Sequence, residues 1–500
     1  MPEDDLGARE TEVVAGRRDS LDRLKAQGVN PFAVGFPQDT WAAELHAEFP
    51  DGALANEEES ERLAAVAGRV VLARRMGKLV FLVLRDRTGD IQLFCERSSM
   101  DEASPALLDE IDLGDIVGAT GHVVRTRRGE LSLKVETLTM LTKALRPLPE
   151  KWHGLKDPDL QQRRRYLHLI ADETPRRYLL ARALVLKTIR RVLDDDGYVE
   201  FEGPVLQTVA GGANAQPFTT YHQALDMPMK LRISLELYLK RMLVGGVERV
   251  YEIGRNFRNE GVDATHSPEF TMLEVYEAYG DYNTMATLTR EIVLDAARAL
   301  GNTVVPDGHG GEIDLEGEWR HLPILEAVSE AVGEQIDVDT PVETLRKLAD
   351  RHDVALQPVW GAPEVVVELY EQLVEDTLLQ PTFVTDYPAA VKPLAKPHRS
   401  KPGLVEAWDL IIGGVELAPA YSELNDPVEQ RRRLVEQSRK AAGGDPDAMH
   451  LDEDFLRAME FGMPPQGGMG LGIDRLLRLL TGVPSLRDTI AFPLLKPEAH

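Results

Sequence analysis

The chain of 500 residues has a single cysteine, Cys95, and no long run of uncharged apolar residues. One cysteine excludes an intrachain disulfide, which fits a reducing compartment. The N-terminus, Met-Pro-Glu-Asp-Asp, lacks the basic start and apolar core of a targeting signal. No segment approaches the roughly 20 apolar residues that a membrane helix needs. We therefore expect a cytoplasmic protein without a membrane span.

The chain also lacks a net positive charge, because 83 Asp and Glu outnumber 57 Lys and Arg and give a net charge of −26. Such a chain does not coat nucleic acid generally, since phosphate contacts require local positive charge. Residues 1–65 contain 6 basic and 15 acidic side chains, whereas residues 66–166 contain 18 basic and 14 acidic. Residues 66–166 are therefore the segment that a nucleic acid can use. The length exceeds what one hydrophobic core holds, so we expect several domains.

The first two expected parts are an acidic leader and a small barrel. Residues 1–65 are read as a solvated leader with an N-terminal helix around Ser20. Residues 66–145 contain short apolar runs separated by turn residues, as in a five-stranded Greek-key barrel of the OB type. The expected strands are residues 66–72, 79–86, 91–96, 116–126 and 131–141.

The remaining chain is expected to form a linker and a larger α+β domain. Residues 146–170 are proline-rich and basic and are read as a linker. The domain of residues 171–500 opens with an amphipathic pattern that predicts a helix from 175 to about 196. A strand up to Phe201 and the pair Gly203-Pro204 follow. Strands then alternate with helices, with an insertion of weaker signal around residues 301–380.

Two motifs carry chemical information. The first contains Arg258, Asn259 and Glu260 in the run from Val250 to Gly261, and the second is Gly467-Gly-Met-Gly-Leu-Gly-Ile-Asp-Arg475. They resemble motifs 2 and 3 of the class II aminoacyl-tRNA synthetases. The helix, strand and proline before them are similar to motif 1, which forms the family's dimer interface. The resemblance implies a homodimer and a mostly antiparallel catalytic sheet flanked by helices.

The resemblance extends from about residue 60 to the C-terminus and is specific for lysyl-tRNA synthetases. In that family the N-terminal barrel binds the anticodon, and a Gly-Lys-x-x-Phe run carries a stacking ring. Bases of a single-stranded loop require aromatic rings for stacking and amides for base edges. The implied partner is tRNA(Lys), and the implied anticodon readers are Phe81, Gln92 and Glu130. The competing interpretation is structural, because aromatic residues at every second position of a strand often belong to the hydrophobic core.

Amino-acid activation is an in-line attack of a carboxylate on the α-phosphorus of ATP. An α-carboxylate with a pKa of about 3.5 is ionised at pH 7, so the step needs positioning and charge neutralisation rather than a base. The resemblance implies that Arg258 contacts the carboxylate and the α-phosphate and that Arg475 contacts the γ-phosphate. It also implies adenine contacts from Glu260 and Phe270, and β/γ-phosphate contacts from His266.

A terminal ammonium needs carboxylate acceptors and an aromatic wall for its methylene stem. Glu274 and Tyr276 alternate onto one face of a predicted strand, and Tyr421 and Glu423 repeat the pattern. The resemblance gives these four side chains, with Arg258, to lysine, and gives its α-amino group to Glu236 and Gly212. For Mg²⁺ on the triphosphate it implies Asp409 and Glu416, although both positions are usually Glu in the family.

Four departures from the family pattern lie near this site. Pro419 stands where the family carries Asn or another hydrogen-bonding residue, and Gln216 replaces an Arg; Ala390 and Lys392 replace a Glu and a Ser. The leading interpretation is an enzyme that makes lysyl-adenylate and transfers lysine to the 3′ end of tRNA(Lys). Two others stay open: a specialised paralogue that activates a lysine analogue or tolerates an inhibitor, and a non-catalytic tRNA-binding regulatory protein.

Overall fold

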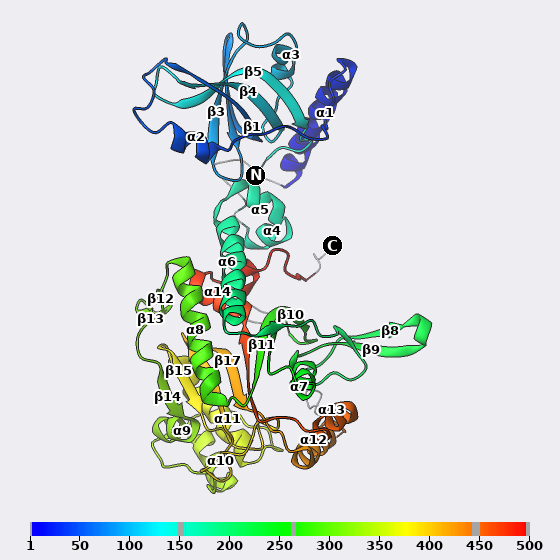
Figure 1. The fold of residues 1–500 in the computed structure, drawn as a ribbon, viewed down its shortest axis with the longest axis vertical. Coiled ribbons are helices and arrows are strands. Elements are labelled where there is room, and N and C mark those ends of the chain that lie inside the picture. The colour runs from blue at the N-terminus through cyan, green and yellow to red at the C-terminus, as the bar shows by residue number, and fades with distance from the viewer. Residues whose placement is uncertain (1–2, 149–154, 156, 262–266, 443–450, 497–500) are drawn as a thin grey trace. The chain divides into compact units, whose positions relative to one another are not determined.

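The computed structural model describes residues 3–148, 155, 157–261, 267–442 and 451–496. The chain divides into two compact units, residues 1–156 and residues 157–500, which are coloured along the chain in Figure 1. None of the described helices is both long and apolar enough to cross a membrane.

The first unit is built around a closed five-stranded barrel with strand order β1-β2-β3-β5-β4. Alternate residues of each strand point inward: on β2 these are Val80, Leu82 and Leu84, all of which are buried. The sole cysteine, Cys95, is buried in the same core. The predicted OB-type barrel is therefore confirmed. Its strands are β1 (Glu59–Met76), β2 (Leu79–Arg85), β3 (Asp90–Glu96), β4 (Ile116–Arg125) and β5 (Leu131–Thr142), and the helices of this unit are α1 (Glu3–Ala26), α2 (Ala42–Glu48) and α3 (Ser104–Asp109).

The first barrel strand begins at Glu59, earlier than the position 66 expected from the sequence. The acidic run before position 66 has the composition of a solvated leader, but its side chains find partners in the barrel. Glu59 pairs with Val124 of β4 in the strand register, and its carboxylate lies 2.7 Å from the ammonium of Lys134. This exposed ion pair offsets the negative charge of Glu59, so an acidic residue can begin the strand.

The second unit contains an eight-stranded sheet in the order β14-β15-β16-β17-β18-β11-β10-β6. Adjacent strands in this sheet are antiparallel, except for the parallel pairs β14–β15 and β6–β10. The expected mostly antiparallel sheet is therefore confirmed. The strands are β6 (Val199–Glu200), β10 (Arg249–Phe257), β11 (Glu269–Ala278), β14 (Arg320–Pro323), β15 (Thr382–Thr385), β16 (Ala407–Ile412), β17 (Val415–Ser422) and β18 (Gln466–Gly472).

Helices pack on both faces of this sheet. One face packs against α6 (Thr174–Asp195), α8 (Tyr282–Leu300) and α14 (Ile473–Thr481) through one large apolar core, and α6 and α8 run beside the sheet in Figure 1. On the other face, α7 (Glu236–Val244) packs against Val250, Tyr276 and Ala278. Part of this second face stays open, and the candidate site lies there.

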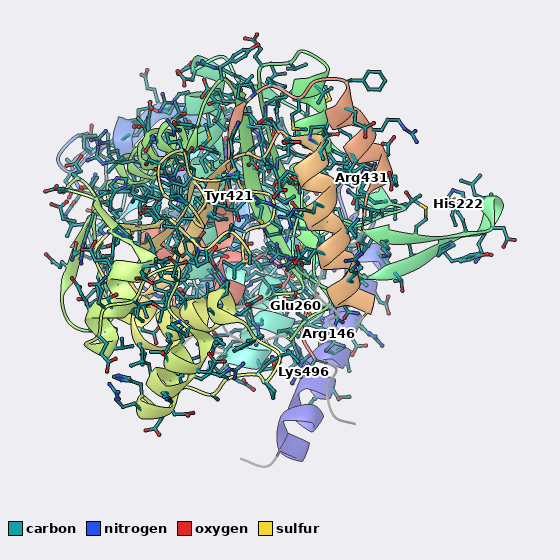
Figure 2. All side chains as sticks on the ribbon, turned by 90° about the horizontal axis from the view of Figure 1, so that it is seen from below. Arg146, His222, Glu260, Tyr421, Arg431 and Lys496 are labelled. Carbon is teal, nitrogen blue, oxygen red and sulfur yellow. The ribbon has the colours of Figure 1, made fainter. Side chains whose placement is uncertain are left out.

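The remaining elements surround this core. The helices of the region around residues 301–380 pack on one another and on strands β15 and β16 in a second apolar core, which includes Val384 and Ile411. The predicted linker, residues 146–170, contains two short helices, and the Arg165 guanidinium is buried there, donating to the carbonyls of Ala491 and Arg487. Smaller sheets are β7-β9-β8 and β12-β13, and Figure 2 shows the β8–β9 hairpin, with His222 labelled, extending from the body. The bounds are α4 (Pro158–Arg163), α5 (Arg165–Ala171), β7 (Leu206–Gln207), β8 (Thr219–His222), η1 (Gln223–Leu225), β9 (Met227–Leu231), β12 (Val304–Pro306), β13 (Glu312–Asp314), α9 (Ile324–Val332), α10 (Val342–Arg351), α11 (Ala362–Leu373), η2 (Glu375–Thr377), α12 (Pro427–Ala442), α13 (Glu453–Glu460) and α15 (Leu486–Thr489).

Candidate active site

Two adjoining cavities lie on the open face of the eight-stranded sheet. The first has a volume of about 250 Å³, and the second about 200 Å³. Arg258, Met272 and Pro419 line both cavities, so the two are joined at these side chains. The first cavity is polar at its inner end and includes Gly212, Ser234, Glu236, Glu274, Tyr276, Lys392, Tyr421, Glu423, Gly468 and Gly470.

Strand alternation brings the predicted lysine-binding side chains together. Leu273 and Val275 of β11 belong to the core on the helix-covered face, so Glu274 and Tyr276 point to the opposite face, into the first cavity. On β17, Tyr421 also lines the cavity, as does Glu423 directly after the strand.

Glu274 is held in one orientation by three donors. Its Oε1 accepts hydrogen bonds from Ser234 Oγ at 2.9 Å and from the Leu235 amide at 3.0 Å, and its Oε2 accepts one from the Tyr276 hydroxyl at 3.0 Å. Burial, reinforced by the charge of Glu236, raises the pKa of Glu274 to about 7. A cation that reaches this carboxylate therefore stabilises its ionised form.

An internal cation lies beside the other two carboxylates. Lys240, on α7, places its ammonium 2.5 Å from Glu236 Oε1 and 2.6 Å from Glu423 Oε2. Burial opposes the charge of Lys240, but Glu236 and Glu423 outweigh it and raise the pKa of the ammonium. Two buried carboxylates thus share one ammonium, and the charge of a third, Glu274, interacts with both of them. The inner end therefore carries more negative than positive charge, which favours a second cation.

Gly468 creates the space in which these groups meet. A Cβ at this position of β18 would overlap Glu423 Oε1 and the Tyr276 ring. Gly468 pairs with Tyr276 on β11 and with Tyr421 on β17, so it lies between the two strands that supply the site. Glycine at this position allows both side chains to occupy the cavity.

The second cavity brings together the groups predicted for ATP. Glu260, Phe270 and Arg475 line it, together with Arg258, Glu416 and Asp474. Strand β10 ends at Phe257, so Arg258 and Glu260 lie in the segment that follows the strand. The Arg258 guanidinium lies 5.1 Å from the centroid of the Phe270 ring, and burial lowers its pKa. His266 falls outside the described residues.

Arg475 is anchored at the start of α14. Its Nη1 donates to the carbonyl oxygen of Glu416 at 2.6 Å and lies 3.7 Å from the Glu416 carboxylate. The neighbouring Asp474 accepts from the Thr271 amide at 2.8 Å and pairs with Arg182 of α6. These contacts fix the first turn of α14 against β11, where Arg475 reaches the cavity.

The two carboxylates predicted for Mg²⁺ lie on a hairpin. Asp409 is on β16 and Glu416 on β17, and the turn between them uses Gly413 and Gly414, both with positive φ. The Glu416 side chain is 41% exposed and lines the second cavity. Both Asp409 oxygens instead accept from Lys392 Nζ, at 2.9 and 2.8 Å. Across the described ranges, no group of three or more His, Cys, Asp or Glu side chains is arranged to hold a metal.

The predicted anticodon readers lie on the outside of the barrel in the first unit. Phe81 is half-buried on β2 and stacks on Phe94 of β3, with ring centroids 5.4 Å apart. Gln92 donates to Ser132 Oγ at 2.8 Å, and Glu130 is exposed in the turn before β5. Phe81 is therefore not part of the barrel interior.

The sequence did not single out Ser234 and Lys240, although both contact the predicted carboxylates. A lysine four residues after a glutamate on a helix is typical of an exposed ion pair, so the pattern carried no sign of a buried site. Of the four departures, Pro419 and Lys392 line the first cavity, whereas Gln216 and Ala390 do not.

Comparison with known proteins identifies the family. The family model for class II tRNA synthetases (D, K and N) matches residues 157–496, and that for the OB-fold nucleic acid binding domain matches residues 64–141. The chain is 48% identical over 503 residues to a lysine–tRNA ligase of Thermosynechococcus vestitus, with 99% of both chains covered. It is 47% identical to one from a Synechococcus strain, covering 98% of this chain and all of that one.

A second group of relatives is longer. The lysylphosphatidylglycerol biosynthesis bifunctional protein LysX of Mycobacterium marinum is 47% identical over 500 residues. The match covers 99% of this chain and 44% of LysX, so the chain spans less than half the length of that relative. The matching family models and the full-length similarity together show that the chain belongs to the class II lysyl-tRNA synthetases.

Proposed function

We propose that the chain activates L-lysine with ATP to form lysyl-adenylate and then transfers lysine to the 3′ end of tRNA(Lys). The observation that carries this proposal is the position of Arg258, which lines both cavities. A guanidinium there reaches a carboxylate in the first cavity and a phosphate in the second. Arginine suits this role because its planar group donates several hydrogen bonds to such oxygens.

The first step joins the lysine α-carboxylate to the α-phosphorus of ATP, and pyrophosphate leaves. Because the carboxylate is already ionised, the site needs no general base for this step. Arg258 aligns the two reactants and offsets the charge that grows on the α-phosphate. Arg475 does the same for the γ-phosphate, with Glu260 and Phe270 on adenine and His266 on the β/γ-phosphates.

Selection of lysine rests on the anionic inner end of the first cavity. The side-chain ammonium of the substrate is proposed to enter between Glu274 and Glu423, with the phenols of Tyr276 and Tyr421 along its stem. A neutral side chain of similar length leaves these carboxylates without a cation. Glu236 and the backbone near Gly212 are assigned to the α-amino group.

Magnesium is proposed to arrive with ATP and to supply positive charge to its phosphate oxygens. The Glu416 carboxylate suits it, because it is partly exposed in the second cavity. Asp409, the second predicted ligand, already accepts two hydrogen bonds from Lys392.

Transfer requires that the chain also binds tRNA(Lys), for which we propose the outer face of the barrel. Phe81, Gln92 and Glu130 supply a ring, an amide and a carboxylate there, the group types that read unstacked bases. We propose that the enzyme works in the cytoplasm, where its tRNA is found.

A homodimer is proposed through the region of α6, β6 and the β7-β9-β8 sheet. Strand β6 is an edge of the main sheet, and an unpaired edge beside exposed apolar side chains favours association. The large apolar side chains exposed in this region are Leu180, Leu184, Val199, Val205, Leu206, Tyr221 and Leu225.

A specialised paralogue is the second candidate, and Pro419 favours it. Pro419 lines both cavities, at the junction where the amino acid and nucleotide would meet, and it offers no backbone or side-chain donor. A lysine analogue that needs no hydrogen bond here would be accepted as well as lysine.

ATP–pyrophosphate exchange with a panel of amino acids tests both candidates. Lysine, ornithine, arginine, norleucine and a set of lysine analogues are each supplied at equal concentration with ATP. Exchange that is fastest with lysine supports the leading proposal, and exchange that is fastest with an analogue supports the paralogue. Absence of exchange with every member would leave the non-catalytic alternative.

A further inference from the structure

Lys392 forms a closed ion pair beside the candidate site. It lies in the segment between β15 and β16, and its ammonium donates to both carboxylate oxygens of Asp409. The two side chains are 19% and 11% exposed. The ammonium also lies 4.5 Å from the ring centroid of Tyr387 and 5.6 Å from that of Tyr421, within the range of cation–π contacts. Its position is therefore fixed from several sides.

The surroundings of this pair are strongly anionic. Glu371 and Glu375 lie close enough to Asp409 and Glu416 for their charges to interact. Burial, followed by the charges of Glu416, Glu371 and Asp409, raises the pKa of Glu375 to about 7. Such a cluster requires a compensating cation. Lys392 supplies one as part of the chain.

A divalent metal at Asp409 would need the carboxylate oxygens that accept from this ammonium. Mg²⁺ lies about 2.0–2.1 Å from each carboxylate oxygen that binds it. Both oxygens of Asp409 already accept from Lys392, so the pair Asp409 and Glu416 does not fit a shared metal while the ammonium is in place. Glu416 stays open to the second cavity, where it can meet a metal carried by ATP.

We propose that the Lys392 ammonium acts as a built-in cation at Asp409, in place of a divalent metal, while Glu416 alone serves the magnesium that ATP carries. This inference deepens the proposed function and rests on it for the identity of the nucleotide site. It assigns Lys392 a positioning role: the residue holds Asp409 and the adjoining wall of the amino-acid cavity without a metal. A sequence with a neutral residue at position 392 would need an additional ion.

Counting bound manganese tests the proposal directly. The wild-type protein and Lys392→Ser are titrated with Mn²⁺ in the presence of a non-hydrolysable ATP analogue, and free Mn²⁺ is measured by electron paramagnetic resonance. Lys392→Ser is expected to bind one more Mn²⁺ per chain than wild type, and the double variant Lys392→Ser/Asp409→Asn is expected to lose it again. Equal numbers in wild type and Lys392→Ser would overturn the proposal.

Lys396→Ser is the matched control. Lys396 belongs to the same segment, but its ammonium donates to Asn425 at 2.8 Å and not to Asp409. It is expected to bind as many Mn²⁺ ions as wild type. If Lys396→Ser gained as many Mn²⁺ ions as Lys392→Ser, the extra ion would result from the loss of any positive charge. That result would refute the assignment of the ion to Asp409.

A second readout covers the case in which Lys392→Ser folds poorly. Lys392→Met removes the charge and both hydrogen bonds that the ammonium donates to Asp409, but retains a long stem. Its melting temperature is expected to rise with added Mn²⁺ by more than that of wild type, and an equal response in both would contradict the proposal. Neither readout requires turnover. If the wild-type protein exchanged no pyrophosphate with lysine but Lys392→Ser still bound the additional Mn²⁺, the proposed function would be refuted and the role of Lys392 would stand.

Discussion

Replacing Arg258 with alanine removes the one guanidinium that lines both cavities. Its role is to meet charge that grows during the reaction, and loss of one such donor typically costs about 2.7–4 kcal/mol of barrier. Because about 1.4 kcal/mol is a factor of ten, pyrophosphate exchange should fall by about 100-fold to 1000-fold. The fold should survive, since the described contacts of Arg258 are a 3.4 Å hydrogen bond to Ile233 and the Phe270 ring.

Arg255→Ala is the matched control for this experiment. Arg255 lies three residues earlier, on β10, where its guanidinium is 3.4 Å from Glu269 in an exposed ion pair. Exposed pairs contribute little to stability, so this variant should melt and exchange like wild type. The reasoning is refuted if Arg258→Ala keeps more than about a tenth of wild-type exchange, which is a loss below about 1.4 kcal/mol.

Three further predictions concern the barrel, the cavity junction and pH. Phe81→Ala should weaken tRNA charging by about 1–3 kcal/mol with lysine activation unchanged, as loss of one stacked base requires; equal loss in both assays would make Phe81 a structural residue. Pro419→Asn should lower the Michaelis constant for lysine, corresponding to about 0.5–1.5 kcal/mol for a regained neutral hydrogen bond; no change would show that a side chain there does not reach the ligand. Because the pKa of Glu274 is raised to about 7, lysine must displace a proton at lower pH. Calorimetry should therefore show lysine binding weakening as the pH falls below 7, by up to about tenfold per pH unit for each carboxylate that must lose a proton. Glu274→Gln should reduce this slope without abolishing it, because burial also raises the pKa of Glu423 to about 8, and an unchanged slope would contradict the role of Glu274.

Local patterns were enough to anticipate the barrel and the strand faces. The period-two alternation of Val80, Leu82 and Leu84 gives the inward face of β2, and the same alternation puts Glu274 and Tyr276 on one face of β11. These features depend on neighbours in the chain, so they could be read without coordinates. The position of Arg258 between the two cavities could be anticipated only from the resemblance to a family.

Contacts between distant segments could not be read from the sequence. Lys240 is buried because Glu423, which follows β17 far along the chain, reaches the same point, and nothing in the helix sequence signals this. Lys392 reaches Asp409 because of the path taken between β15 and β16. The start of β1 at Glu59 was missed because charged residues were taken to mark solvent, whereas Lys134 provides a partner across the barrel.

The central claim is that one lysine and one ATP meet at Arg258, with the lysine ammonium at the inner carboxylates. A crystal structure with a non-hydrolysable lysyl-adenylate analogue tests it most directly. The account predicts the ammonium within hydrogen-bond distance of Glu274 and Glu423, the phosphate substitute on Arg258, and adenine against Phe270. An analogue bound with its ammonium away from these carboxylates, or with its phosphate substitute away from Arg258, would contradict the account.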